Sequence, residues 1–447
     1  MRRAFLLAAT SLVLFACPNG GGNDGGTGGG SGGGGGSGGA SGFNIQTLDT
    51  TTGEKKWIAM AYDSAANRIA IAYYVKLTTT TMNFPDFALK YIEWRNGTVS
   101  AAETIVPRVQ LGIGLSIAFD PTTNEPVVGY LGGGDEQMTF IWLQSDMMIA
   151  RRSAAGTWTE QTVAIASAAV CGNAVSDRGN IAGVWPAITF DSTGKLYVFW
   201  RDVHNGQFPQ QDWAGSDVEG NEVMGGGVTN ICVAEGGNAK SAWGGRINAV
   251  LGKDDQPMII FDRCDITGAE AEGRDVIWMR RTAAGSWTGP RTAQGVGNTQ
   301  TGASLAYDAL AGDGGTYGIA VVDKGTNVLK YIESNDGEGW TFPDSVYGSG
   351  SGGWYPSLAF DPMFHEPAIA WYLCAKASGV DESVCPATED ELRVSQRIGV
   401  GAAATWRTVL VDVEGGWLPK LGFLANGKRF VVYRGKPNYD LKLAIER

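Results

Sequence analysis

Short apolar strands separated by polar turns recur along most of the chain. Six segments run through an apolar strand, a turn rich in Asp, Pro, Gly and Asn, and a second apolar strand that ends near an aromatic residue. They begin at Trp57, Leu115, Pro186, Ile247, Ser304 and Pro356, and a seventh, from Pro419, has lost its Asp. This pattern predicts a β-hairpin in each segment.

A second hairpin follows in most of these units. Its turn is small and rich in Gly, and a Trp often opens its last strand, at Trp158, Trp287, Trp340 and Trp406. A Trp at one repeated position is expected to pack between neighbouring repeats. Each unit is thus four antiparallel strands in about 50–70 residues, which is typical of a β-propeller blade.

The seventh unit ends one strand short. The segment Phe43–Thr50, just before the first unit, can supply the missing strand. Its pairing with the last three strands would close the ring and remove an exposed sheet edge. The sequence therefore predicts an all-β, seven-bladed propeller of four-stranded antiparallel blades over residues 43–447, closed by an N-terminal strand.

An Asp recurs at the first turn of most units, and we expect its side chain to close that turn. These residues are Asp63, Asp120, Asp191, Asp308 and Asp361. In a later turn, Ser334–Thr341 reads SNDGEGWT. It resembles the Asp-box of the BNR propellers in the sialidase-like superfamily, with one residue fewer before the Trp. The resemblance implies the fold of residues 43–447 and no catalytic role, because Asp-boxes are turn elements in that family.

The first 42 residues have a different composition. Arg2 and Arg3 precede the twelve-residue apolar run Ala4–Phe15, which is too short to span a hydrocarbon core of about 30 Å. Residues 1–16 therefore predict a signal peptide. Residues 14–17 resemble the bacterial lipobox, which implies a diacylglycerol on Cys17; an ordinary signal peptide followed by a chance Cys is the alternative.

A Gly-rich linker follows Cys17. Residues 20–42 hold 16 Gly among 23 positions, so residues 17–42 predict a lipidated Cys and a flexible tether. We expect an exported protein that is anchored to the cell envelope. Pro18 is not the Asp that retains lipoproteins at the inner membrane in some bacteria, which favours the outer membrane of a Gram-negative organism.

The net charge is −11, and charged residues make up 18 % of the chain. Nucleic acid and anionic membrane surfaces would repel such a protein. We therefore expect a glycan or protein ligand, no nucleic acid, and contact with the membrane through Cys17. The low charge content also argues against a helical bundle, and the 43 % of hydrophobic residues argues against general disorder.

Loop length indicates a binding face. With strands named A to D outward from the axis, the B–C and D–A connections hold nearly all the extra length. The longest are assigned to Asp202–Val228, Leu373–Asp390 and Ser167–Val184. Long connections are often functional, so we expect a ligand at this rim. Neutral drift of surface loops is the alternative.

Two sets of residues decorate the loop-rich rim. Trp residues mark the starts of strand A, at Trp57, Trp185, Trp243, Trp354 and Trp417. They either stack on sugar rings or fill spaces between blades. A divergent column follows the aromatic residue near the end of strand B, at Tyr74, Leu131, Arg201, Asp262, Val322, Tyr372 and Arg434.

The arginines of this region suggest an anion site. Arg201, Arg263 and Arg434 are candidates to hold a carboxylate by forked hydrogen bonds. The alternative is that they form ion pairs with Asp202 and Asp262. No residue is assigned to catalysis, because sialidase-like chemistry needs an Arg triad, a Tyr with a Glu partner and an Asp acid that the sequence does not place.

The cysteines fit an oxidising compartment. Cys374 and Cys385 bracket one loop and predict a disulfide, and among Cys171, Cys232 and Cys264 we favour the pair Cys171 and Cys232. No cofactor is expected. The acidic run Asp212, Asp217, Glu219 and Glu222 offers oxygen ligands for Ca²⁺, but its spacing matches no known calcium loop, so solvated charge is favoured.

The sequence favours a non-enzymatic module that binds a carbohydrate or protein on the loop-rich rim. A sialidase-like glycoside hydrolase or lyase is the first alternative. A structural subunit of an envelope complex, with the ring as an assembly platform, is the second.

Overall fold

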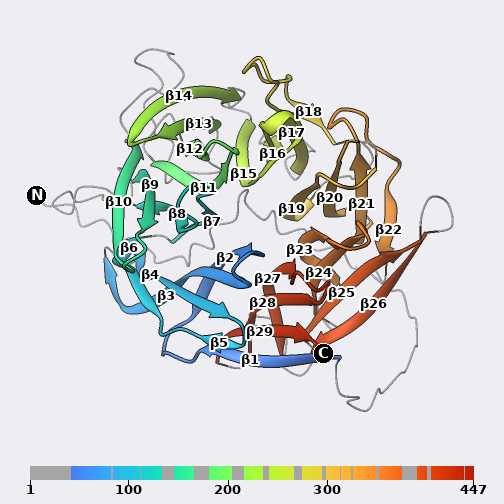
Figure 1. Cartoon of the computed structure of the whole chain (residues 1–447), viewed down its shortest axis with the longest axis horizontal. Coiled ribbons are helices and arrows are strands. Elements are labelled where there is room, and N and C mark those ends of the chain that lie inside the picture. The colour runs from blue at the N-terminus through green and yellow to red at the C-terminus, as the bar shows by residue number, and fades with distance from the viewer. Residues whose placement is uncertain are drawn as a thin grey trace, which may run out of the picture.

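Seven antiparallel sheets surround one axis in the computed structural model of the chain (Figure 1). The structure describes residues 42–81, 84–110, 112–132, 145–165, 181–203, 216–234, 241–265, 274–293, 299–312, 314–323, 326–348, 352–374, 390–399, 404–436 and 438–447. The predicted signal peptide and nearly all of the Gly-rich tether therefore lie outside the described residues. The seven-bladed architecture is confirmed.

Each of the first three blades runs outward from an inner strand. Blade 1 consists of β2 (Lys55–Asp63), β3 (Arg68–Thr81), β4 (Phe84–Arg95) and β5 (Thr98–Val99), with β6 (Glu103–Gln110) also paired to β4. Blade 2 consists of β7 (Leu115–Phe119), β8 (Pro126–Gly132), β9 (Asp146–Arg152) and β10 (Trp158–Ala164). Blade 3 consists of β11 (Ile181–Phe190), β12 (Leu196–Val203), β13 (Asp217–Met224) and β14 (Gly227–Ala234).

The remaining blades repeat this order. Blade 4 consists of β15 (Ser241–Leu251), β16 (Pro257–Asp265), β17 (Arg274–Arg280) and β18 (Arg291–Thr292), with the 3-10 turn η2 (Lys253–Asp255). Blade 5 consists of β19 (Thr299–Asp308), β20 (Thr316–Asp323), β21 (Val328–Ser334) and β22 (Asp344–Tyr347). Blade 6 consists of β23 (Gly352–Phe360), β24 (Pro367–Cys374), β25 (Asp390–Ile398) and β26 (Thr405–Asp412).

Blade 7 contains both ends of the propeller. Its strands are β27 (Gly415–Phe423), β28 (Arg429–Gly435), β29 (Leu441–Glu446) and β1 (Phe43–Asp49). The N-terminal strand β1 pairs antiparallel with β29, from Phe43 opposite Glu446 to Asp49 opposite Leu441. It forms the outer edge of the blade (Figure 1). The predicted closure is confirmed.

One loop assignment from the sequence is wrong. The segment from Asp202 to Val228 contains strand β13 and the start of β14, which meet at a tight turn through Gly225 and Gly226. Asp217, Glu219 and Glu222 therefore belong to a strand and do not form an acidic loop. The few large apolar residues in DVEGNEVM obscured this strand, although Val218 and Val223 are buried.

Every inner strand bends at the same place. The bend residue has a φ between +45° and +82° in all seven blades, and the set is Trp57, Gly114, Trp185, Arg246, Gly302, Tyr355 and Leu418. The two glycines give room to large neighbours. A Cβ on Gly114 would lie 2.8 Å from Trp185 Cα, and one on Gly302 would lie 2.7 Å from Arg246 Cδ. The small and large bend residues thus complement one another around the axis.

The bend corrects the alignment of the Trp residues. Trp57 and Trp185 occupy the bend itself, whereas Trp354 and Trp417 lie one residue before it. Trp243 lies three residues before the bend residue of blade 4. The five Trp are therefore not one structural column, because alignment by residue type ignored the glycines that precede each bend.

Polar side chains two residues after the bend join neighbouring blades. The Ser116, Ser304 and Ser357 hydroxyls accept backbone N–H groups of the next blade at 3.0, 3.0 and 2.9 Å. The Asn248 side-chain amide donates to the Ala303 carbonyl at 3.0 Å. The inner strand of each blade is a sheet edge, so some of its backbone groups have no neighbouring strand to bond to. These side chains satisfy such groups.

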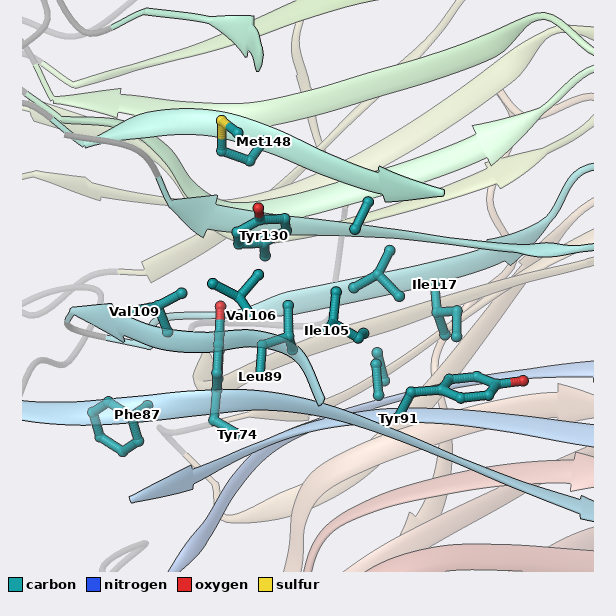
Figure 2. Close-up of a cluster of buried hydrophobic side chains, with 14 of the residues drawn as sticks. Tyr74, Phe87, Leu89, Tyr91, Ile105, Val106, Val109, Ile117, Tyr130 and Met148 are labelled. Carbon is teal, nitrogen blue, oxygen red and sulfur yellow. The ribbon is translucent and has the colours of Figure 1, made fainter. Parts of the chain in front are cut away.

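Aromatic side chains fill the spaces between blades. Each repeated Trp of the outer strands packs on an aromatic ring of the preceding blade: Trp158 on Tyr91, Trp287 on Phe199, Trp340 on Trp278 and Trp406 on Tyr331, with centroids 5.2–6.1 Å apart. Figure 2 shows one such interface, where Tyr74 and Phe87 of blade 1 meet Tyr130 and Met148 of blade 2. The predicted packing role is confirmed.

The turn Asp residues close their turns as expected. Asp120 accepts the Thr122 N–H at 2.8 Å, and Asp361 accepts the Met363 N–H at 2.8 Å. Asp336 of the Asp-box-like turn accepts the Glu338 and Gly339 N–H groups at 2.7 and 2.8 Å. These backbone hydrogen bonds hold the pKa of Asp336 below its ordinary value.

Deletion of Phe43–Asp49 should destabilise the whole ring, because β29 would become an exposed edge and the buried Phe43 and Leu48 would be lost. We expect a loss on the order of 3–5 kcal/mol from these two side chains. Urea denaturation measures it. Deletion of residues 20–41 is the control and should leave the midpoint unchanged; equal effects of the two deletions would contradict the closure.

Trp354→Ala should cost about 3–5 kcal/mol of unfolding free energy, as for other buried large-to-small changes. Trp354 is fully buried in the core between blades 5 and 6. Phe364→Ala is the control, because that ring is 69 % exposed on the opposite rim. Thermal and urea unfolding report both values, and a Trp354 variant as stable as the control would contradict its role as a packing residue.

Candidate ligand-binding site at the axial channel

The seven inner strands enclose a channel of about 320 Å³ along the propeller axis. Each blade lines it with the bend residue and the residues that follow. We call the seven bend residues the mouth ring: Trp57, Gly114, Trp185, Arg246, Gly302, Tyr355 and Leu418. Because inner strands begin where the D–A connections arrive, the mouth ring lies at the loop-rich face.

Aromatic and cationic groups meet in the mouth ring. The rings of Trp57 and Trp185 pack edge to face at 4.5 Å, on either side of Gly114. The Arg246 guanidinium lies 5.9 Å from the Trp185 ring and 3.7 Å from the Asp262 carboxylate. Trp57 remains partly exposed, whereas Trp185 and Arg246 are buried for the most part.

The divergent column lies behind the mouth ring. Arg201, Tyr372 and Arg434 pair across the sheet with Val184, Trp354 and Trp417, each one residue before a bend. The column is therefore one structural position, as the repeat suggested. All seven of its side chains are buried, so it supports the mouth from inside and does not form an exposed surface.

The three candidate arginines do not form one carboxylate clamp. Arg201 Nε donates to the Ser216 hydroxyl at 2.8 Å, in blade 3. Arg263 forms an ion pair with Asp275 in blade 4. Arg434 of blade 7 donates to Glu54 at 2.8 Å and lies 4.0 Å from the centroid of the Trp417 ring.

The sequence offered ion pairs with Asp202 and Asp262 as the alternative. Arg263 and Arg434 instead form ion pairs with Asp275 and Glu54. Asp262 lies close to Arg246 of the mouth ring. Arg434 of blade 7 contacts Glu54, which directly precedes β2 of blade 1. Asp202 is buried on β12, opposite Asp217. Sequence reasoning missed Arg246 because the residue takes the place of a Trp or Tyr at the bend.

A second polar group lies beneath the rim of blades 6 and 7. The Tyr372 hydroxyl donates to Asp390, and Lys436 Nζ lies 2.7 Å from the same carboxylate. Burial, together with the bond to Asp390, raises the pKa of Tyr372 well above its ordinary value. Tyr372 thus remains a protonated hydrogen-bond donor that fixes the start of β25.

Inside the channel, the residues two positions after the bend form the channel ring: Ala59, Ser116, Ala187, Asn248, Ser304, Ser357 and Lys420. Lys420 and Arg246 are the charged side chains among the described residues that line the channel. The sequence contained a signal for this ring, because ASLAYD, LSIAFD and PSLAFD carry Ser at the same place as Lys in PKLGFL.

Several predicted sites include residues that the structure does not describe. Asp212, Cys171 and Cys385 lie outside the described residues, so both disulfide pairings remain predictions, although Cys374 is disulfide-bonded. Cys232 lies on β14, opposite Glu219. Glu222 pairs with Arg281 at 2.7 Å. In the part of the chain that the structure describes, no group of three His, Cys, Asp or Glu side chains is arranged for a metal ion.

The structure contains no helix long and apolar enough to cross a bilayer among its described residues. The chain matches no known family model and no curated protein.

Solved structures of similar fold come from several organisms. The NanB sialidase of Streptococcus pneumoniae has a TM-score of 0.44 at 10 % identity, over 90 % of this chain and 70 % of that one. The α-L-arabinofuranosidase arb93a of Fusarium graminearum has 0.46 at 9 %, over 91 % and 96 %. A protein of unknown function from Dyadobacter fermentans has 0.45 at 9 %, over 90 % and 98 %. The likeness concerns the propeller architecture alone.

Proposed function

We propose that the propeller is a ligand-binding module of the cell envelope, which takes a carbohydrate at the mouth ring and is held to the membrane by a lipid on Cys17. The observation that carries the proposal is the convergence of Trp57, Trp185 and Arg246 at the entrance of a channel on the loop-rich face. Sites for small ligands combine a concave wall, aromatic faces and a few polar groups.

A sugar fits the chemistry of this mouth. The partly exposed Trp57 offers an apolar surface to one face of a pyranose ring. The Arg246 guanidinium supplies donors for hydroxyl or carboxylate oxygens of the ligand. The buried column behind the mouth supports these groups, since Asp262 lies 3.7 Å from Arg246 and Arg434 donates to the Lys55 carbonyl, two residues before Trp57, at 2.6 Å.

Support for the anchor comes from the sequence and from the position of β1. The apolar run Ala4–Phe15 and the lipobox-like residues 14–17 precede a Gly-rich tether. This tether joins the propeller at Phe43, on the outer edge of blade 7 (Figure 1). An attachment at the periphery leaves the mouth ring clear of the tether's point of entry.

Trp57→Gly should weaken glycan binding at least ten-fold, which corresponds to about 1.4 kcal/mol. Gly keeps the left-handed bend, as in blades 2 and 5, and removes the Trp57 side chain together with its contact to Trp185. A glycan array on residues 43–447 identifies the ligand, and calorimetry measures the affinity. Phe364→Ala, on the opposite rim, is the matched control and should bind as the unmodified propeller does.

Four outcomes would contradict the proposal. A propeller that binds no glycan, or a Trp57→Gly variant with unchanged affinity, would remove the mouth as the site. Turnover in a panel of glycoside hydrolase and lyase substrates would make the molecule an enzyme. Co-purification as a fixed subunit of an envelope complex, without glycan affinity, would favour the assembly role.

Cys17→Ser should release the protein from membranes after signal processing, because the acylated thiol is the proposed anchor and the Gly-rich tether holds no apolar surface. Fractionation of cells with detergent phase separation measures the shift from the membrane to the soluble fraction. A Cys17→Ser protein that stays with the membrane would contradict the lipid anchor.

A further inference from the structure

Lys420 lies in the wall of the axial channel and has no partner among the residues that the structure describes. Its side chain belongs to the channel ring, two residues after the bend of blade 7. Among the described residues, no hydrogen bond or ion pair joins its Nζ, whereas Arg246 at the mouth has Asp262. Burial lowers the pKa of Lys420, and no neighbouring carboxylate offsets this effect.

Lys420 is half-buried, so its ammonium can meet a ligand in the channel. No carboxylate occurs among the described residues that line this channel. The chain as a whole carries a net charge of −11, so its cationic channel is a local exception. A compensating anion is therefore expected to enter from solution.

Serine hydroxyls occupy the position of Lys420 in the channel ring of the two preceding blades. Ser357 of blade 6 accepts the Leu421 N–H, next to Lys420 in sequence, at 2.9 Å. Ser304 of blade 5 accepts the Leu358 N–H at 3.0 Å. Each hydroxyl uses one oxygen lone pair in these bonds and keeps its own proton. Lys420, Ser357 and Ser304 thus present one cation and two hydroxyls from three consecutive blades.

Apolar residues precede and follow the channel ring on each inner strand, and most of them are buried between blades. Those that precede it are Ile58, Leu115, Pro186, Ile247, Ala303, Pro356 and Pro419, and those that follow it are Met60, Ile117, Ile188, Ala249, Leu305, Leu358 and Leu421. The channel of about 320 Å³ is roughly ten times the volume that one water occupies in the liquid. Its size admits an organic molecule of several heavy atoms, which is much larger than a single inorganic ion.

We propose that the axial channel binds a small organic carboxylate, with the carboxylate against Lys420, Ser357 and Ser304 and the organic body along the rest of the channel. This site lies inside the channel, so it does not depend on which ligand the mouth ring takes. It gives the molecule a second binding chemistry, a charged head group with an apolar or aromatic body.

Benzoate is the probe, and Lys420→Met is the variant, because Met keeps most of the side-chain volume and removes the charge. Calorimetry on residues 43–447 should show one benzoate per chain, with an affinity that falls at least ten-fold in Lys420→Met. Lys428→Met, in the turn between β27 and β28 of the same blade, is the matched control and should bind normally. Benzyl alcohol, which lacks the charge, should bind at least ten-fold more weakly than benzoate.

The thermal stability of Lys420→Met distinguishes a loss of binding from a folding defect. Removal of an unpaired, half-buried charge should leave the fold intact and should not lower the midpoint of thermal unfolding in ligand-free buffer. Benzoate should then raise the midpoint of the unmodified propeller and not that of Lys420→Met. Trp57→Gly should retain benzoate binding, which separates this site from the mouth.

Three results would overturn the proposal. Unchanged benzoate affinity in Lys420→Met, or equal thermal stabilisation of both proteins, would exclude Lys420 as the anion ligand. Chloride that competes as tightly as benzoate would show a site for inorganic anions and reject the organic carboxylate.

Discussion

The left-handed bend at the start of each inner strand is the constraint on which the rest of the molecule depends. It turns the chain at the same point in seven blades, so that large and small bend residues complement one another around the axis. A bend at a bulky residue such as Trp185 is unfavourable by about 1–3 kcal/mol. The packing of Trp57 on Trp185, and of Trp185 over Gly114, offsets that cost. The strained bend positions therefore include Trp57, Trp185 and Arg246, the groups that we propose for the mouth.

Two kinds of polar interaction fix this geometry. Serines after the bend bond to the backbone of the next blade, which couples inner strands that belong to different sheets. Behind the mouth, Arg434 bonds to Glu54 across the junction where the ring closes. Removal of one partner from such a pair costs more than the pair contributes. We therefore expect the geometry of the mouth to depend on the closure of the ring by β1.

Much of the fold could be predicted from the sequence, because apolar alternation and turn residues recur in every blade. The closure by Phe43–Asp49, the Asp turns and the packing of Trp158 or Trp406 followed from the same repeat. Strand β13 was missed because Glu219 and Glu222 interrupt its apolar residues. The candidate site was predicted less well. A column of Trp residues does not reveal which of them occupies a bend, and Trp354 proved to be fully buried. Lys420 was overlooked, although its place is that of the serines in the other repeats, because a single Lys in a strand suggests a solvated surface.

The central claim is that the channel enclosed by the seven inner strands is the place where this molecule binds small ligands. A crystal structure of residues 43–447 soaked with 4-bromobenzoate tests it most directly, because the bromine marks the ligand by its anomalous signal. The account predicts one bromine peak on the propeller axis, with the carboxylate beside Lys420 Nζ. Peaks confined to the outer surface, with an axial channel that holds only water at the same ligand concentration, would contradict it.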